Sequence, residues 1–180
     1  MLRTPGGTLW LTGLPSAGKT TTGEAVWGLL AQHQLHCHLL DGDELREGLN
    51  ADLSFSDADR AENVRRLGEV AVLLACQGCL SIVSAISPRA ASRDAVRHRH
   101  EVLGLRFVEV HVATPLEVCE ARDPKGLYAR ARRGELGAFT GVSAPYEPPT
   151  CPELVLGTEA TPEQVAREVL QAMFDAALIS

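Results

Sequence analysis

The 180-residue sequence has few aromatic residues and no long hydrophobic run. Aromatic side chains make up 4% of the chain and charged ones 22%, whereas hydrophobic residues reach 45%. This composition is that of a globular protein, and it excludes disordered, collagenous and coiled-coil chains. The longest apolar candidates are interrupted by Glu69, by Gln77 and Gly78, or by Arg89, so none approaches the ~20 residues that cross a bilayer. We therefore expect a soluble protein that does not enter a membrane.

Positive charge is also scarce. Lysine and arginine number 17 against 23 aspartates and glutamates, which gives a net charge of -6. This balance argues against a broad attraction to nucleic acid or to acidic membrane surfaces. Any anionic ligand must therefore meet a local cluster of positive side chains.

The five cysteines are an odd number, and residues 1–7 lack the charged, apolar and small-residue blocks of a signal peptide. We therefore expect free thiols and a cytoplasmic location, where thiols stay reduced. The spacing of Cys76 and Cys79 is typical of redox and zinc motifs, but no second cysteine pair accompanies it. Both residues are expected to be core thiols.

The chain has the length of one compact domain, with no internal repeat or change of composition that marks a second one. Helical spacing at residues 19–32, 56–76, 89–102, 115–121 and 161–178 alternates with strand-like runs at 8–11, 38–40, 80–85, 107–112 and 154–156. This alternation predicts an α/β fold of three α/β/α layers, in which helices cover both faces of a five-stranded parallel sheet. Thr161 is the expected N-cap of the last helix, with Pro162 in its first turn.

Residues 13–20, Gly-Leu-Pro-Ser-Ala-Gly-Lys-Thr, match the pattern G-x-x-x-x-G-K-[ST] between a strand and a helix. The pattern predicts a P-loop NTPase fold, because its backbone amides and the helix N-terminus form an anion site. Lys19 is expected to reach the β- and γ-phosphates, and the Thr20 hydroxyl to help hold Mg²⁺. The alternative is a glycine-containing turn without a ligand. The predicted nucleotide-binding residues of the loop are Gly13, Ser16, Ala17, Gly18, Lys19, Thr20 and Thr21.

Two carboxylates follow the second predicted strand, in Asp41-Gly42-Asp43. Their position favours contact with Mg²⁺ and with an acceptor, while the base-reading motif N-K-x-D of switch GTPases is absent. This combination favours a small-molecule kinase. The alternative for both aspartates is a turn at the strand end that caps the following helix.

On a helical wheel of residues 56–78, Arg60 falls within the apolar stripe and Asn63 lies on the same side. A charge on the buried side needs a partner, which is either a structural carboxylate or an anionic ligand. Arg46 and Phe55 stand just upstream. An aromatic ring beside two arginines suits a nucleotide-like substrate, although a lone Phe is more often a core residue.

Residues 122–152 are rich in glycine, proline and charge, with one short helical piece at 129–132. So long a polar stretch in a compact domain usually serves as a lid or binding loop. We expect residues 122–139 to form a lid that closes when nucleotide is bound, because residues 123–126 combine charge and a flexible glycine with little apolar anchoring. Closure would bring Lys125 to the phosphates and Phe139 over the substrate.

The sequence resembles the adenylylsulfate kinase (APS kinase) family over nearly its whole length. The resemblance is carried by GLPSAGKTT at 13–21, DGDELREGLNADLSFSDADRAENVRR at 41–66, AISP at 85–88, PLEVCEARDPKGLYARARRGEL at 115–136 and FTGVSAPYEPP at 139–149. The two longest of these segments are far more specific than the P-loop. The family usually reads GLSGAGKST and FISPYR, so Pro15 and Arg89 are departures from its pattern.

The resemblance implies transfer of the ATP γ-phosphoryl group to the 3′-hydroxyl of adenosine 5′-phosphosulfate (APS), with Mg²⁺. It implies that Arg46, Arg60 and Asn63 hold APS and that Phe55 and Phe139 stack on its adenine. Asp43 would lie near the acceptor hydroxyl, and Lys125 on the lid. Further contacts are expected from Arg122 to ATP and from Asp41, Ile86, Ser87, Gly126 and Leu127 to the substrate, with Thr20 and Asp41 as the metal-binding pair.

The resemblance leaves several points open. The family includes members with a phosphoserine at the position of Ser87, but here we expect a loop serine that bonds the backbone. A homodimer and a functional link to ATP sulfurylase are further expectations. The alternatives to APS kinase are a related P-loop kinase with another acceptor and a nucleotide-binding module with impaired catalysis.

Overall fold

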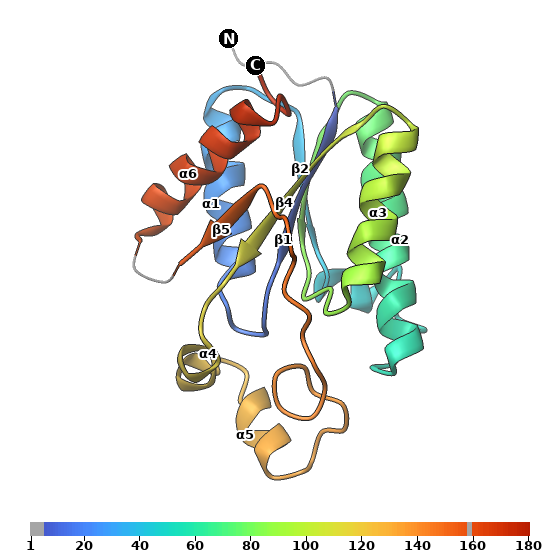
Figure 1. The fold of residues 1–180 in the computed structure, drawn as a ribbon, viewed down its shortest axis with the longest axis vertical. Helices are drawn as coiled ribbons and strands as arrows, with labels where there is room; N and C mark the ends of the chain where they lie inside the picture. Colours follow the sequence, from blue (N-terminus) through green and yellow to red (C-terminus); the bar gives the residue numbers. More distant parts are fainter. Residues whose placement is uncertain (1–5, 158–159) are drawn as a thin grey trace.

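The computed structural model describes residues 6–157 and 160–180, and it has a single parallel sheet at its centre. Strands β1 (Gly7–Thr12), β2 (Cys37–Asp41), β3 (Leu80–Ser84), β4 (Arg106–Val112) and β5 (Leu154–Leu156) lie in the order β2-β3-β1-β4-β5 (Figure 1). Every pairing is parallel. The five predicted strands and their parallel arrangement are confirmed.

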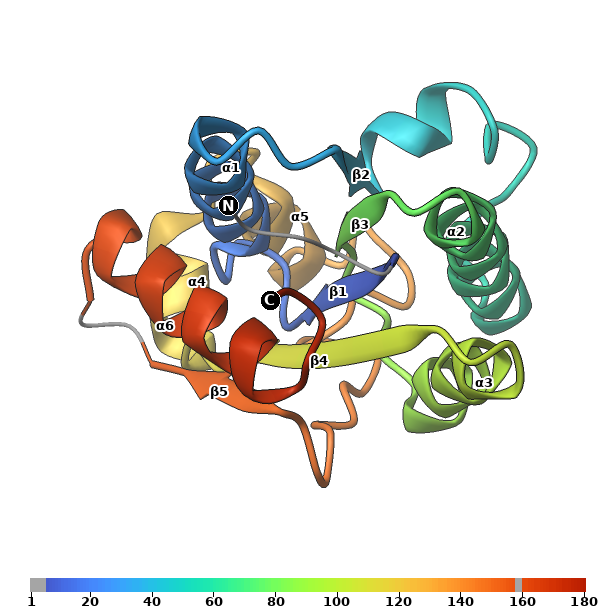
Figure 2. The ribbon, with the colours of Figure 1, turned by 90° about the horizontal axis from the view of Figure 1, so that it is seen from above.

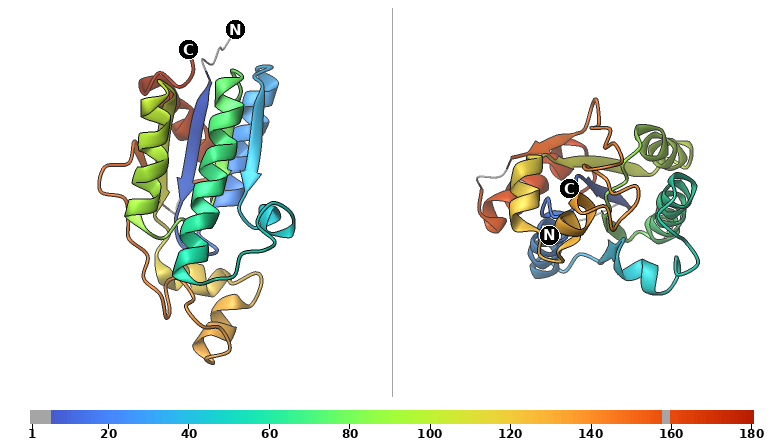
Figure 3. Two further views of the ribbon diagram at one scale, coloured as in Figure 1. Left: turned by 90° about the vertical axis from the view of Figure 1, so that its right-hand side faces the viewer. Right: turned by 90° about the horizontal axis from the view of Figure 1, so that it is seen from below.

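Helices cover both faces of the sheet, as the alternating pattern predicted. Helices α1 (Lys19–Gln32) and α6 (Pro162–Asp175) pack side by side on one face, and α2 (Asp57–Cys76) and α3 (Ala90–Val102) on the other (Figure 2). The short helices α4 (Leu116–Arg122) and α5 (Leu127–Arg132) lie beyond the carboxyl ends of the strands (Figures 1 and 3). A 3₁₀ helix, η1 (Glu44–Glu47), follows β2.

The central strand β1 divides the hydrophobic interior into two cores. Leu9 and Leu11 belong to the core beneath α1 and α6, whereas Trp10 belongs to the core beneath α2 and α3. Alternate side chains of a strand point to opposite faces, so one strand serves both cores. At Gly68 a Cβ atom would lie 2.7 Å from Cγ2 of Val96, which shows that α2 and α3 pack too closely for a side chain there.

The predicted helix at 161–178 is confirmed at its start and ends earlier than expected. Thr161 forms a capping box with Gln164, in which each side chain bonds the other residue's backbone N–H. The helix ends at Asp175 because the chain turns at Ala177, which has a φ of 54°. This turn buries Leu178 and Ile179 in the core under α1 and α6.

Helix α5 begins two residues before the predicted start at 129. The Asp123 carboxylate accepts hydrogen bonds from the backbone N–H groups of Tyr128 and Ala129. These bonds satisfy amides at the beginning of the helix, as an N-cap side chain does, so the helix starts two residues earlier. The sequence pattern also missed η1, which is too short to show a helical period.

The five cysteines are free thiols, but the prediction that Cys76 is a core thiol is wrong. Cys76 is exposed at the last residue of α2, and Cys79 is half-buried. In the described part of the chain no helix is long and apolar enough to cross a membrane. The expectation that no signal peptide is present concerns residues that include 1–5, which lie outside the described part.

Candidate active site

A cavity of about 920 Å³ lies at the carboxyl ends of the strands. Neighbouring strands β1 and β3 lead into α1 and α3 on opposite faces of the sheet, and such a divergence opens a binding crevice. The volume is near the upper end for single-ligand pockets. Most of the predicted site residues line it: Ser16, Ala17, Gly18, Lys19, Thr20, Thr21, Asp41, Asp43, Arg46, Phe55, Arg60, Asn63, Ile86, Ser87, Arg122, Lys125, Leu127 and Phe139.

The predicted P-loop connects β1 to α1 along one side of the cavity. Gly18, at the N-cap of α1, has a φ of 104°, which glycine adopts without strain. Gly13 does not line the cavity, but a Cβ there would lie 2.5 Å from the Val112 carbonyl oxygen, so the position excludes any side chain. The loop therefore delivers the positive end of the α1 dipole to the cavity.

Lys19 is the cation of this loop, and among the described residues its side chain is bonded only to carbonyl oxygens. Its Nζ donates to the oxygens of Gly13 at 3.1 Å and Leu14 at 2.7 Å, and the residue is 8% exposed. Burial lowers the pKa of Lys19 to about 8, against the opposing charges of Asp43 and Asp41. A phosphate placed in the cavity would supply the negative charge that these carbonyls lack.

Thr20 and Asp41 bring two hard oxygen donors together at the end of the P-loop. Thr20 Oγ1 donates to Asp41 Oδ2 at 2.7 Å. Among residues 6–157 and 160–180, no group of three or more His, Cys, Asp or Glu side chains could hold a metal ion. Magnesium fits this pair, because it takes one or two protein oxygens and completes its shell with phosphates and water.

Asp41 also has the turn-forming role that the sequence left open. Its Oδ1 accepts from the backbone N–H of Asp43 at 2.8 Å, at the step from β2 into η1. The two roles are compatible because they use different carboxylate oxygens. The aspartate is thus held by the turn while its second oxygen faces Thr20.

Asp43 and Lys125 meet across the cavity from distant parts of the chain. Lys125 Nζ lies 2.7 Å from Asp43 Oδ2, and both side chains are mostly exposed. The carboxylate raises the pKa of Lys125, chiefly through their hydrogen bond. The structure therefore brings the predicted catalytic aspartate and the predicted lid lysine into direct contact.

Arg60 is buried, as its place on the apolar stripe predicted, but its partner is not a carboxylate. Its guanidinium donates to Thr140 Oγ1 at 2.7 Å and to the backbone oxygens of Phe55 and Ala138. Burial, followed by the charge of Arg46, lowers the pKa of Arg60. All three hydrogen-bond partners are uncharged, and Asp57 acts on the guanidinium group only through its charge, so this buried cation favours an anion in the cavity.

Phe55 is 60% exposed on the cavity, so the alternative of a core residue is wrong. The Cζ atoms of Arg46 and Arg60 lie 4.5 and 5.8 Å from the centre of its ring. Asn63 lies near them on α2, and its Oδ1 accepts from Asn50 Nδ2 at 3.0 Å. The group combines an exposed ring with two cations, as the sequence predicted for a nucleotide-like substrate.

Ser87 lies in the turn between β3 and α3 and is buried there. Its Oγ accepts from Trp10 Nε1 at 3.0 Å and donates to Thr12 Oγ1 at 3.0 Å. The expected backbone bond, to the Ala85 oxygen, is also present at 3.3 Å. A phosphoryl group on this oxygen would have to displace all of these contacts.

The predicted lid packs against the P-loop more firmly than its composition suggested. Tyr128 is buried, and its hydroxyl donates to the Pro15 oxygen at 3.0 Å. Its ring contacts Phe139 edge-on, with 5.0 Å between the ring centres. Arg122 Nη1 lies 3.3 Å from the Ala17 oxygen. The expectation of little apolar anchoring in residues 122–139 is therefore wrong.

Two predicted residues, Gly13 and Gly126, do not line the cavity, and several lining residues were missed. Gly126 instead forms the N-cap of α5 with a φ of 65°. The missed residues are mostly small or apolar and carry no chemical signature in the sequence. Five of them come from the end of β5, the segment that follows it and the first turns of α6: Leu156, Gly157, Ala160, Pro162 and Val165.

Comparison with known proteins agrees with this geometry. The family model described as adenylylsulphate kinase matches residues 5–157. The adenylyl-sulfate kinases of Saccharomyces cerevisiae and Shewanella amazonensis are 49% and 53% identical, over 97% and 85% of this chain and 87% and 76% of their own lengths.

A similar solved structure is that of the Mycobacterium tuberculosis APS kinase CysC in complex with AMPPNP and APS. It superimposes with a TM-score of 0.92 at 48% identity, over 94% of this chain and 98% of that one. The family model covers well over half of the chain, and both relatives exceed 30% identity across most of it. The chain therefore belongs to the adenylylsulphate kinase family.

Proposed function

We propose that this protein transfers the γ-phosphoryl group of ATP to the 3′-hydroxyl of APS, giving 3′-phosphoadenosine 5′-phosphosulfate and ADP. The observation that carries the proposal is a single cavity that joins a P-loop to an exposed aromatic ring between two arginines. Its volume of about 920 Å³ lies near the upper end of the range for ligand pockets. Membership of the family and the likeness to a complex with AMPPNP and APS support the same reaction.

The ATP phosphates would lie against the P-loop and the N-terminus of α1. Lys19 would exchange its two carbonyl partners for the β- and γ-phosphates, and Arg122 would approach from the lid side of Ala17. Thr20 and Asp41 would hold Mg²⁺. When bound, the ion offsets part of the phosphate charge and so eases the approach of an anionic acceptor.

APS would occupy the other end of the cavity. The hydrogen bonds of Arg46 and Arg60 go to uncharged oxygens, so both guanidinium groups suit the phosphosulfate group. Phe55 offers an exposed ring for the adenine, and Phe139 lines the cavity from the lid. Asn63, Ile86, Ser87 and Leu127 would complete the contacts.

In the transfer itself, the 3′-oxygen forms a bond to the γ-phosphorus as the bond from that phosphorus to the β–γ bridging oxygen breaks. We assign Asp43 the role of accepting the hydroxyl proton, because its carboxylate reaches into the cavity beside the P-loop. Lys125 would leave Asp43 and stabilise charge on the transferred group. The packed lid would exclude water, which otherwise competes with the hydroxyl as acceptor.

Four associated properties remain predictions. The requirement for Mg²⁺ follows from the donor set of Thr20 and Asp41. A homodimer and a functional link to ATP sulfurylase follow from the family resemblance alone. A cytoplasmic location is a further proposal, supported by the five free cysteines.

The proposal is tested by incubating the purified chain with ATP, MgCl₂ and APS and separating the nucleotides by chromatography. We expect APS-dependent formation of ADP and of a product whose new phosphate is located on the 3′-oxygen by ³¹P NMR. AMP, which lacks the sulfate, should be a much poorer acceptor, and omission of MgCl₂ should stop the reaction. ADP formation that is independent of APS, or faster with another alcohol, would contradict the proposal.

A further inference from the structure

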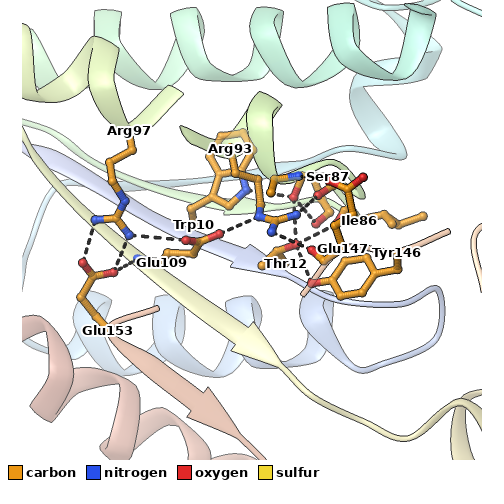
Figure 4. Close-up of polar contacts among 12 residues, drawn as sticks. Trp10, Thr12, Ile86, Ser87, Arg93, Arg97, Glu109, Tyr146, Glu147 and Glu153 are labelled. Carbon is orange, nitrogen blue, oxygen red and sulfur yellow. Dashed lines mark hydrogen bonds and ion pairs between the residues drawn. The ribbon is translucent and has the colours of Figure 1, made fainter. Parts of the chain in front are cut away.

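Arg93 of α3 and Glu109 of β4 form an ion pair inside the protein (Figure 4). Arg93 Nε lies 2.7 Å from Glu109 Oε1, and the side chains are 2% and 6% exposed. Removing two charges from water costs about as much as their attraction returns, so a buried pair adds little net stability. Its role lies in the hydrogen bonds that the other two nitrogens of the Arg93 guanidinium group donate.

The two other nitrogens of Arg93 bind backbone oxygens from two separate segments. Nη1 donates to the Ser87 oxygen at 2.7 Å, and Nη2 donates to the Glu147 oxygen at 2.7 Å. Because the guanidinium group is a rigid planar fork, Glu109 fixes the direction of both bonds when it binds Nε. The ion pair therefore joins β4 to the turn at residues 85–88 and to the segment after the lid.

The same turn is held from the side of β1. Thr12 Oγ1 donates to the Ile86 oxygen at 2.8 Å, and Trp10 Nε1 donates to Ser87 Oγ at 3.0 Å. Tyr146 reaches the same Thr12 hydroxyl with its own, at 3.0 Å (Figure 4). Both the carbonyl and the hydroxyl of Ser87 are thus fixed by buried side chains.

This support is needed because the turn is strained. Ser87 has a φ of 41°, in the left-handed region that residues other than glycine rarely adopt. Such a residue keeps its conformation only where the surrounding structure holds it, and strained residues of this kind cluster at functional sites. The Arg93 bond, with those of Trp10 and Thr12, holds the turn in this conformation.

The turn forms part of the cavity on the side of α2. Ile86 and Ser87 line the cavity, and Arg93 does not. Arg89, the next residue after the turn, donates from Nη2 to Asp57 Oδ2 at 2.6 Å, at the beginning of α2. Phe55 and Arg60 flank that helix start, so the turn adjoins the proposed APS end of the cavity.

We propose that Arg93, aimed by Glu109, is a positioning residue for acceptor binding. It touches neither substrate, and it acts by holding Ile86 and Ser87 in the strained turn that borders the acceptor. The identity of the acceptor as APS rests on the proposed function. The positioning itself concerns only contacts within this chain.

The test compares Arg93→Lys with Arg97→Ala in the full-length protein. Lysine keeps the buried charge near Glu109 but cannot bind three fixed acceptors in one plane. Arg97 is the matched control, because it lies on the same helix and contacts Glu109 Oε2 at 3.4 Å, yet its other partner is Glu153 and not the turn. Kinetics with each substrate varied are combined with hydrogen exchange and the thermal midpoint Tm.

For Arg93→Lys we expect kcat/KM for APS to fall by about 10²-fold, since small misplacements of binding groups have effects of this size. KM for ATP should change by less than about twofold, and exchange at residues 85–89 should speed up. Arg97→Ala should keep both KM values within about twofold. Equal losses of kcat/KM for ATP and for APS would overturn the proposal. So would a lowered Tm with an unchanged KM for APS and unchanged exchange at residues 85–89.

Thr12→Val provides a second variant if Arg93→Lys does not fold. It removes the donor to the Ile86 oxygen without changing the charge or the shape of the side chain. We expect kcat/KM to fall for APS and not for ATP, as in Arg93→Lys. Unchanged APS kinetics and exchange in this variant would overturn the proposal. If the wild-type protein fails to phosphorylate APS, the proposed function is wrong, whereas the exchange measurement still decides whether Arg93 positions the turn.

Discussion

Lys125 Nζ lies 2.7 Å from Asp43 Oδ2, so one ion pair connects the lid to the carboxyl end of β2. The two side chains are 64% and 72% exposed. An ion pair this exposed contributes at most about 1 kcal/mol, because water screens it and ordering two side chains has an entropic cost. The contact can therefore be exchanged for phosphate oxygens when substrates enter.

Asp43→Asn tests the role of the aspartate in this pair. The amide keeps the shape of the side chain but cannot accept a proton, so kcat should fall by about 10² or more with a modest change in KM for APS. Glu44→Gln is the control, since it removes the same charge from an exposed neighbour in η1. Steady-state kinetics of both variants decide the matter, and a kcat for Asp43→Asn equal to that of the control would remove Asp43 from the catalytic group.

A second prediction concerns pH and Lys19. Its pKa in the folded protein is about 8, below the ordinary value of 10.5, so the free enzyme loses this charge as pH rises above about 8. Bound phosphates favour the charged form. Binding of AMPPNP near pH 8.5 should therefore take up a proton, and affinity should fall by at most about tenfold per pH unit above pH 8.

Calorimetry in two buffers of different ionisation enthalpy measures this proton uptake. Lys19→Met should abolish it together with turnover, while circular dichroism stays unchanged. The lowered pKa of Lys19 also affects the free energy of unfolding, because the unfolded chain binds this proton more tightly than the folded protein between about pH 8 and 10.5. Lys19 therefore makes the protein without nucleotide more stable as pH rises through this range. AMPPNP binding without proton uptake would show that Lys19 does not meet the phosphates.

A third prediction separates the two ends of the cavity. Arg60→Ala removes a charge whose present partners are uncharged, and it should raise KM for APS by about tenfold to 100-fold while KM for ATP changes little. Arg65→Ala is the control, because Arg65 lies on the same helix but pairs with Glu62 at the surface. Equal effects on both substrates would mean that Arg60 serves only to hold the lid through Thr140 and Ala138.

Patterns with a local cause were predictable from the sequence, and contacts between distant segments were not. The P-loop, the Thr161 cap and the inward side of Arg60 each follow from residue types at short spacing. The partners of Arg60 at the end of the lid and just after it, Ala138 and Thr140, lie 78 and 80 residues away, and the spacing could not identify them. The pair of Arg93 and Glu109 was missed for the same reason, because in sequence both look like solvent-exposed charges.

A fourth prediction concerns closure of the lid. The contacts of Tyr128 with Pro15 and of Lys125 with Asp43 hold residues 122–139 near the cavity, the first through buried groups and the second through exposed ones. Hydrogen exchange should therefore be slow at Tyr128 without ligands and should slow further around Lys125 when ADP, Mg²⁺ and APS are added together. Protection around Lys125 that does not change with ligands would indicate a fixed segment rather than a lid.

The last prediction uses the conformation of Gly126, the N-cap of α5. Its φ of 65° lies in the left-handed region, and a Cβ atom would meet nothing within 4 Å, so Gly126→Ala adds backbone strain without a clash. Gly137 is a matched control in the same lid, since a Cβ atom there would also meet nothing within 4 Å and its φ is not in that region.

Gly126→Ala should lower the free energy of unfolding by about 1 kcal/mol. It should also lower kcat, because relaxation of the strain turns α5 and moves Lys125 away from the phosphates. Urea unfolding and steady-state kinetics measure the two effects, and identical behaviour of the two alanine variants would show that the left-handed turn at Gly126 does not position the lid.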